Sequence, residues 1–104
     1  MMDCIEYFID RCWEELCDSK EYTLKAIERK TEHRRWADIL FQTAAQEFAH
    51  YEAFRDMAAD LVAKAKETHH EDWQHIEHRW MREQEKLTLK AIKVKMLHDA
   101  YRNG

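Results

Sequence analysis

The chain has 104 residues, room for one domain with one core, and its single glycine and lack of proline leave few turn-forming residues. A composition of 37% charged and 45% hydrophobic residues then predicts an all-α protein, a single helical domain over residues 1–104, whose small core would gain from association. The net charge of -4 argues against a dedicated nucleic-acid binder, because phosphate binding depends on an excess of basic residues.

Membrane insertion and secretion are not expected from this sequence. The longest stretch without a formal charge, residues 39–46, is far too short to span a bilayer, which takes about 20 apolar residues. Asp3 and Glu6 interrupt the start of the chain, so no signal peptide is indicated. The three cysteines show no Cys-x-x-Cys spacing, which gives no sign of a disulfide framework or a zinc knuckle. We therefore predict a cytoplasmic protein.

Capping patterns predict three long helices joined by tight turns. Asp3 with Glu6 resembles a capping box that opens a first helix, running to about residue 30. Thr31 is the expected N-cap of a second helix, which continues to about residue 67. Thr68 with Glu71 resembles a capping box for a third helix, ending near residue 103. The first two helices are expected to form an antiparallel hairpin, followed by the third.

The most informative feature is Glu47-Phe-Ala-His50, a carboxylate and an imidazole one helical turn apart. They fall on a stripe that advances in alternating steps of four and three residues, as the buried face of a helix does. The stripe consists of Trp36, Leu40, Thr43, Glu47, His50, Phe54, Met57 and Leu61. Burying ionisable groups costs several kcal/mol unless they are paired or bound to a metal. Metal ligation is the first interpretation; the alternatives are a mutually satisfied Glu–His pair, or a stripe rotated by one residue that leaves both groups at an exposed edge.

The expected hairpin brings a third ligand to the same level. Glu15 lies sixteen residues before Thr31 and Glu47 sixteen after it, so both stand roughly 24 Å from the turn at a rise of about 1.5 Å per residue. Glu15 falls on the apolar stripe of its helix, whereas Glu14 falls on the polar face. We therefore predict a metal site formed by Glu15, Glu47 and His50. These residues supply half of the ligand set of di-iron and di-manganese bundles.

The third helix is not expected to supply the other half. Residues at about 86–89 should lie level with Glu47, and none of them is a carboxylate or a histidine, although Glu83 and Glu85 stand within about one turn. A two-fold homodimer, or a higher homo-oligomer, is the economical way to close a four-helix site from two hairpins.

The segment from Glu15 to His50, with Tyr22-Thr23, Ile39-Leu40-Phe41 and Glu47-x-x-His50, resembles the first helical hairpin of ferritin-like proteins of the rubrerythrin type. The chain looks most like their compact half-size form, the encapsulated ferritins. The resemblance implies a ferritin-like four-helix bundle completed by dimerisation, with iron or manganese held by Glu15, Glu47 and His50. It also implies an oxidoreductase activity, either ferroxidase or peroxide-reducing, with Glu47 as the bridging ligand.

A second reading of the sequence is a helical structural or protein-interaction module without catalytic activity, which offers its third helix to a partner. An apolar ladder on that helix predicts a packing edge, and it consists of Trp73, Trp80, Leu87, Ala91, Val94 and Tyr101. A run of lysines, Lys86, Lys90, Lys93 and Lys95, is interpreted as a solvated face. A histidine group near the third helix start, His69, His70, His75 and His78, is either solvated or a surface site for zinc or nickel.

Overall fold

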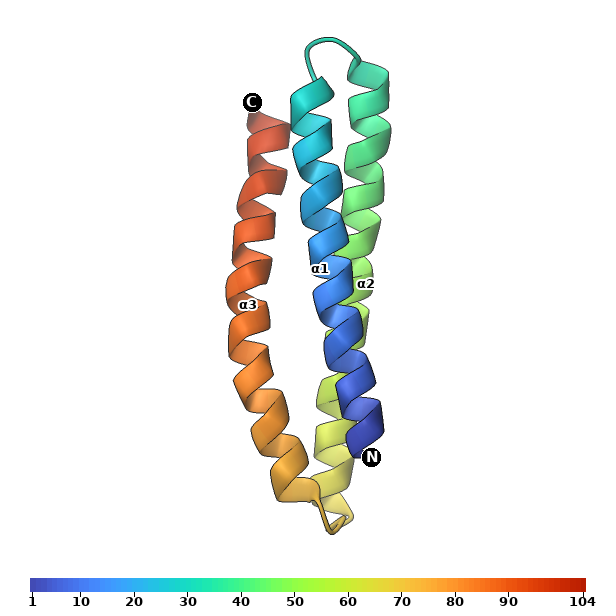
Figure 1. Ribbon diagram of the computed structural model, residues 1–104, viewed down its shortest axis with the longest axis vertical. Coiled ribbons are helices and arrows are strands. Elements are labelled where there is room, and N and C mark those ends of the chain that lie inside the picture. Colours follow the sequence, from blue (N-terminus) through green and yellow to red (C-terminus); the bar gives the residue numbers. More distant parts are fainter.

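The computed structural model describes residues 1–104 as three long α-helices without strands, α1 (Met2–Arg29), α2 (Arg34–Glu67) and α3 (Trp73–Asn103). Figure 1 shows α1 and α2 as an antiparallel hairpin, with α3 running back alongside it. The three helices form a rod of 56 × 18 × 15 Å. The predicted all-α architecture of a hairpin plus a third helix is therefore confirmed. None of the helices has a stretch long and apolar enough to cross a membrane.

The helix ends differ from the predicted capping patterns. No side chain caps the N-terminus of any of the three helices, and Asp3 lies within the first turn of α1. Thr68 closes α2 instead of opening α3, because its hydroxyl donates a hydrogen bond to the Lys64 carbonyl at 2.9 Å. His69 then adopts a left-handed φ of 51°, and the His70 amide bonds back to the Ala65 carbonyl at 3.0 Å. This pattern is a Schellman C-cap, and it delays the start of α3 to Trp73.

The core lies along the facing sides of α1 and α2. The buried residues of α1 are Ile5, Ile9, Cys12, Glu15, Leu16, Ser19, Thr23 and Ala26. Those of α2 are Ala37, Ala44, Phe48, Tyr51, Ala58, Val62 and Ala65. The α2 set has the predicted spacing but is shifted by one residue, so the predicted stripe on α2 is wrong in phase. Trp36 and Met57, expected inside, are 59% and 47% exposed.

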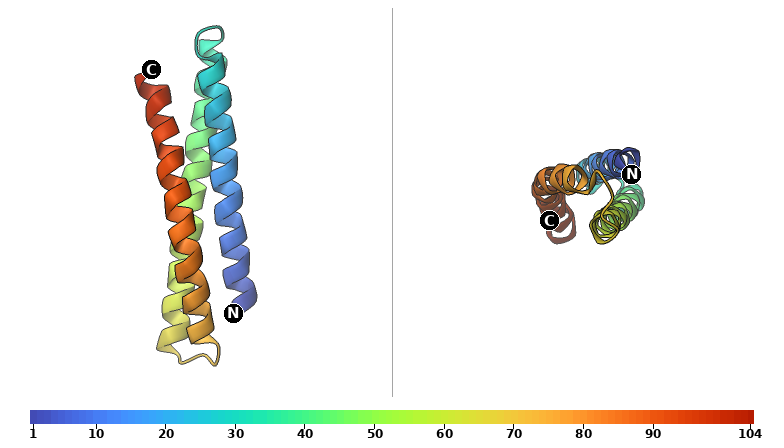
Figure 2. Two further views of the ribbon diagram at one scale, coloured as in Figure 1. Left: turned by 60° about the vertical axis from the view of Figure 1, so that its left-hand side comes forward. Right: turned by 90° about the horizontal axis from the view of Figure 1, so that it is seen from below.

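The third helix covers one side of the hairpin through its predicted apolar ladder. Trp80, Leu87, Val94 and Tyr101 are buried, as are Ile76 and His98 on the same side of the helix. Seen along the rod, the three helices stand at the corners of an open triangle (Figure 2). The ends of the bundle are the two turns, with the N-terminus near the turn between α2 and α3 (Figure 1).

Candidate metal centre

The hairpin brings the three predicted ligands together. Glu15 on α1 and Glu47 and His50 on α2 each offer a ligand atom, and these atoms all lie within 4.8 Å of one another. Counting from the turn predicted this meeting correctly, because the rise along both helices is uniform. No other group of three or more histidine, cysteine, aspartate or glutamate side chains gathers in this way. The four histidines near the start of α3 therefore form no such cluster.

The three side chains differ in burial, which makes the site open on one side. Glu15 is 4% exposed, as predicted, while the side chain of its neighbour Glu14 is 58% exposed. The Glu47 side chain is 22% exposed and that of His50 is 59% exposed. The prediction that His50 points into the core is therefore wrong. The buried stripe of α2 passes through Phe48 and Tyr51, which turns His50 to the rim.

Only one of the two carboxylate oxygens of Glu15 accepts a hydrogen bond. Its Oε1 accepts a hydrogen bond from Arg11 Nη2 at 2.7 Å. Its Oε2 is buried without any hydrogen-bond partner, and it lies 3.6 Å from His50 Nδ1. A buried polar atom left unsatisfied costs about 1–3 kcal/mol. While Glu47 is ionised, no donor satisfies this oxygen, which faces an imidazole and a second carboxylate and is therefore suited to bind a cation.

The electrostatics of the cluster favour a positive ligand. The pKa of Glu47 is raised first by its close interaction with the Glu15 carboxyl group, and then by burial and the Glu15 charge. The pKa of Asp18 is also raised, first by burial and then by neighbouring carboxylates that include Glu47. The negative charge of Glu15 therefore disfavours ionisation of Glu47. A divalent cation bound beside both carboxylates would relieve this repulsion.

The donor set narrows the class of metal that fits. Two carboxylates and one imidazole combine hard oxygens with a borderline nitrogen, which suits divalent iron and manganese. Neither metal can be saturated by these three residues alone, because octahedral sites take six ligand atoms. The candidate site therefore has room for ligands from outside the chain.

No residue of the third helix joins this group. Glu83 lies between α1 and α3, where it accepts hydrogen bonds from Trp13 Nε1 at 3.0 Å and Arg79 Nη1 at 2.8 Å. These bonds lower the pKa of Glu83 in spite of its partial burial. Glu85 is exposed and lies on the outer side of α3.

Two features near the site were missed in the sequence. Arg11 stands four residues before Glu15, which is the spacing of a helical ion pair, so this pair could have been predicted from the sequence.

The second feature is a buried Ser19–His98 pair. It could not have been predicted from the sequence, since the two residues are 79 positions apart. Ser19 Oγ donates to the Ala44 carbonyl at 2.7 Å and lies 3.0 Å from His98 Nε2. Because the only hydroxyl proton is used on the carbonyl, the imidazole must donate to Ser19, which is the reverse of an activated nucleophile.

No protein-family model, curated protein or solved structure matches this chain. The ferritin-like resemblance therefore stays a prediction.

Proposed function

We propose that this chain is a ferritin-like metalloprotein that holds iron or manganese with Glu15, Glu47 and His50. The observation that carries the proposal is the unpartnered, buried Glu15 Oε2, in a group whose ligand atoms lie within 4.8 Å of one another. A hydrogen-bonded Glu–His pair does not account for this arrangement, because the Glu15 oxygen and the His50 nitrogen stand 3.6 Å apart, beyond hydrogen-bond distance.

A two-fold homodimer completes the centre in this proposal. The rim of the site continues along α2 into large apolar side chains, since Trp36, Ile39 and Met57 are 59%, 51% and 47% exposed. Pairing two hairpins through this face would cover these side chains and form a four-helix bundle with six ligand residues around the axis. Such a small chain buries little surface alone, so association also adds to its stability.

The surroundings of each ligand residue indicate its role in the proposed site. Arg11 holds Glu15 Oε1, which leaves Oε2 as the ligand atom and makes Glu15 a terminal ligand. Glu47 interacts only with Glu15 and His50 of the same group, so it would be the ligand shared between metals. His50 closes the rim as a second terminal ligand. Two bound metals would supply redox chemistry toward oxygen or peroxide, which is the proposed ferroxidase or peroxide-reducing activity.

Elemental analysis tests the proposal. Wild-type protein purified with and without air is compared with Glu47→Ala/His50→Ala and with a control pair on exposed positions, Glu14→Ala/His78→Ala. We expect iron or manganese in the wild type and the control, and loss of both from the site variant. Equal metal content in all three proteins, or none in the wild type after incubation with ferrous iron or manganese, would overturn the proposal.

The mass of the protein in solution tests whether two chains share the metal site. We expect a dimer or a multiple of a dimer, and Met57→Glu, on the apolar rim, should lower the mass and weaken metal binding together. A wild-type monomer with full metal content would exclude the dimer-shared site while leaving the three ligands in place.

The alternative, a non-catalytic helical module that binds a partner through α3, is favoured by one observation. The outer side of α3 exposes Leu89 and Met96 at 64% and 65%. This surface is separate from the metal ligands, so one chain can carry both properties.

A further inference from the structure

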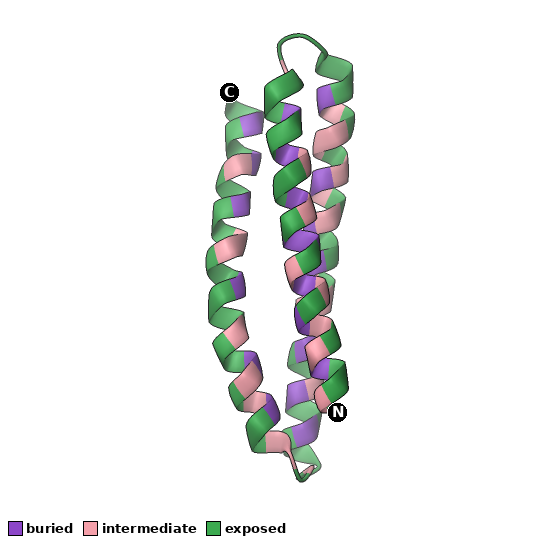
Figure 3. Ribbon diagram, in the orientation of Figure 1, coloured by how far each residue is buried: buried purple, intermediate pink, exposed green.

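The outer side of α3 carries an apolar stripe that nothing in the chain covers. Met81, Leu89, Ile92 and Met96 are 59%, 64%, 53% and 65% exposed, and their spacing places them on one side of the helix. Most of the outer surface of α3 is exposed (Figure 3). Large apolar side chains that are exposed together on one side of a helix are typical of binding surfaces.

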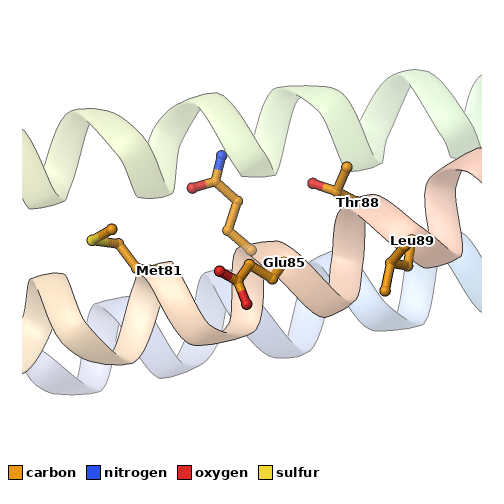
Figure 4. A pocket seen from close by; sticks show the side chains of 5 residues that line it. Met81, Glu85, Thr88 and Leu89 are labelled. Atoms are coloured by element: carbon orange, nitrogen blue, oxygen red, sulfur yellow. The ribbon is translucent and has the colours of Figure 1, made fainter.

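A shallow depression lies within this stripe. It is lined only by α3 residues, namely Met81, Gln84, Glu85, Thr88 and Leu89. Figure 4 shows Met81 and Leu89 at its two ends, with Glu85 and Thr88 between them. A single large apolar side chain from a partner fits such a position as an anchor. Glu85 makes the depression selective, because any group covering it must satisfy a carboxylate.

One edge of the stripe is basic. Arg82, Lys86 and Lys93 are exposed and follow one another along this edge. Lys86 has only a 3.7 Å contact with Glu83. As a whole, α3 carries seven lysines and arginines against four acidic residues, although the chain has a net charge of -4. The helix as a whole is therefore basic in a protein of net negative charge.

The charges argue against a second copy as the occupant. In an antiparallel two-fold pair of helices, each edge lies beside the same edge of its partner, so the basic edges would meet and repel. In a parallel pair, the basic edge would lie beside Gln84, Thr88 and Lys95, none of which is acidic. Neither arrangement gives the charge complementarity that favours association.

The charges also argue against a membrane surface. Glu85 lies between Met81 and Leu89 within the stripe, so it would enter the apolar layer together with them. Placing an unpaired carboxylate there is costly. A protein partner avoids this cost by presenting a lysine or an arginine to Glu85.

We propose that the stripe from Met81 to Met96 docks an amphipathic helix of another protein that is acidic along one edge. The apolar seam of that helix packs on the four exposed side chains and places one anchor in the depression. Its acidic edge lies beside Arg82, Lys86 and Lys93. This mode of recognition combines apolar anchors at helical spacing with charge pairing at the rim. It does not depend on the metal site.

A synthetic helical peptide tests the proposal on the full chain. The peptide has a leucine and isoleucine seam, glutamates along one edge and one lysine placed to meet Glu85; a matched peptide has lysines in place of the glutamates. Fluorescence anisotropy is expected to show the acidic peptide binding about tenfold or more tightly than the basic one. Leu89→Glu should weaken acidic-peptide binding about tenfold, and Arg82→Glu/Lys86→Glu/Lys93→Glu should reverse the preference between peptides.

The control variant is Leu24→Glu, on an exposed apolar position of α1, which should bind both peptides as the wild type does. Circular dichroism of every variant establishes that it is folded. Three results would overturn the proposal: no binding of the acidic peptide, equal binding of the two peptides, or an undiminished affinity in Leu89→Glu. If the protein binds phosphatidylglycerol vesicles and Leu89→Glu abolishes this binding, the occupant of the stripe is instead a membrane surface. If Leu89→Glu lowers the mass of the protein in solution, the occupant is a second copy of the chain.

Discussion

Replacing Glu15 with glutamine should stabilise the metal-free protein and abolish its response to metal. Glu15 is 4% exposed, and satisfying its unpartnered Oε2 is worth about 1–3 kcal/mol. A glutamine amide can donate to Glu47 while its oxygen keeps the bond from Arg11. The weakened pairing with Arg11, whose side chain is 31% exposed, costs under about 1 kcal/mol. We therefore expect a net gain of about 1 kcal/mol, which raises the melting temperature by about 4–8 °C.

Adding metal should make the wild type more stable than the Glu15→Gln protein, which reverses their order of stability without metal. A divalent cation at a hundredfold its dissociation constant stabilises the folded state by about 2.7 kcal/mol, a gain that only the wild type should make. Thermal denaturation followed by circular dichroism, in EDTA and then in manganese chloride at one protein concentration, measures both effects. Glu14→Gln is the matched control, since Glu14 also pairs with Arg11 but is exposed. A Glu15→Gln protein that is less stable without metal, or that gains as much from metal as the wild type, would contradict the proposed role of Glu15 as a metal ligand.

Three further predictions concern neighbours of the site. Arg11→Leu should tighten manganese binding about tenfold in a calorimetric titration, because the positive charge of the guanidinium no longer repels the cation beside Glu15; weaker binding would contradict this. Ser19→Ala should lower the free energy of unfolding in urea by about 1–3 kcal/mol, because His98 loses its acceptor and the Ala44 carbonyl its donor; an unchanged value would contradict it. Burial lowers the pKa of His98 below its ordinary 6.5. As the pH falls, this histidine is therefore protonated in the unfolded chain at a higher pH than in the folded protein. Stability should therefore fall as the pH drops below about 6.5, by up to about 1.4 kcal/mol per pH unit, and His98→Phe should lose this component of the pH slope.

The number and order of the helices were predictable because the sequence leaves the backbone few other choices. With no proline and a single glycine, long helices are the only regular structure that the composition favours. The helix ends were not predictable from capping patterns alone. A threonine hydroxyl can cap the helix that follows or bond to a carbonyl of the helix that precedes it, and Thr68 does the latter.

The position of the site residues along the helix axes was predictable from the sequence. The direction in which they point around each axis was not. Rise per residue is constant, so distance from the turn places Glu15 beside Glu47. The hydrophobic period identifies residues that share a face, but α2 has large apolar residues on two adjoining faces. Phe48 and Tyr51, each one residue after a predicted ligand, occupy the core. One residue turns a helix by about 100°, and this difference moves His50 from the core to the rim.

The position of α3 decides which side of the hairpin is free to pair. Trp13 on α1 bonds to Glu83 of α3, and the Phe48 ring on α2 packs edge-on against His98 of α3. Glu15 is about 200° around α1 from Trp13, and Glu47 is about 100° around α2 from Phe48. A second hairpin can therefore approach the carboxylates without displacing α3. In such a dimer the outer stripe of each α3 faces away from the bundle, so metal binding and docking on α3 are predicted to be independent. A Leu89→Glu protein should accordingly bind metal as the wild type does, and a Glu47→Ala/His50→Ala protein should keep its affinity for the acidic peptide.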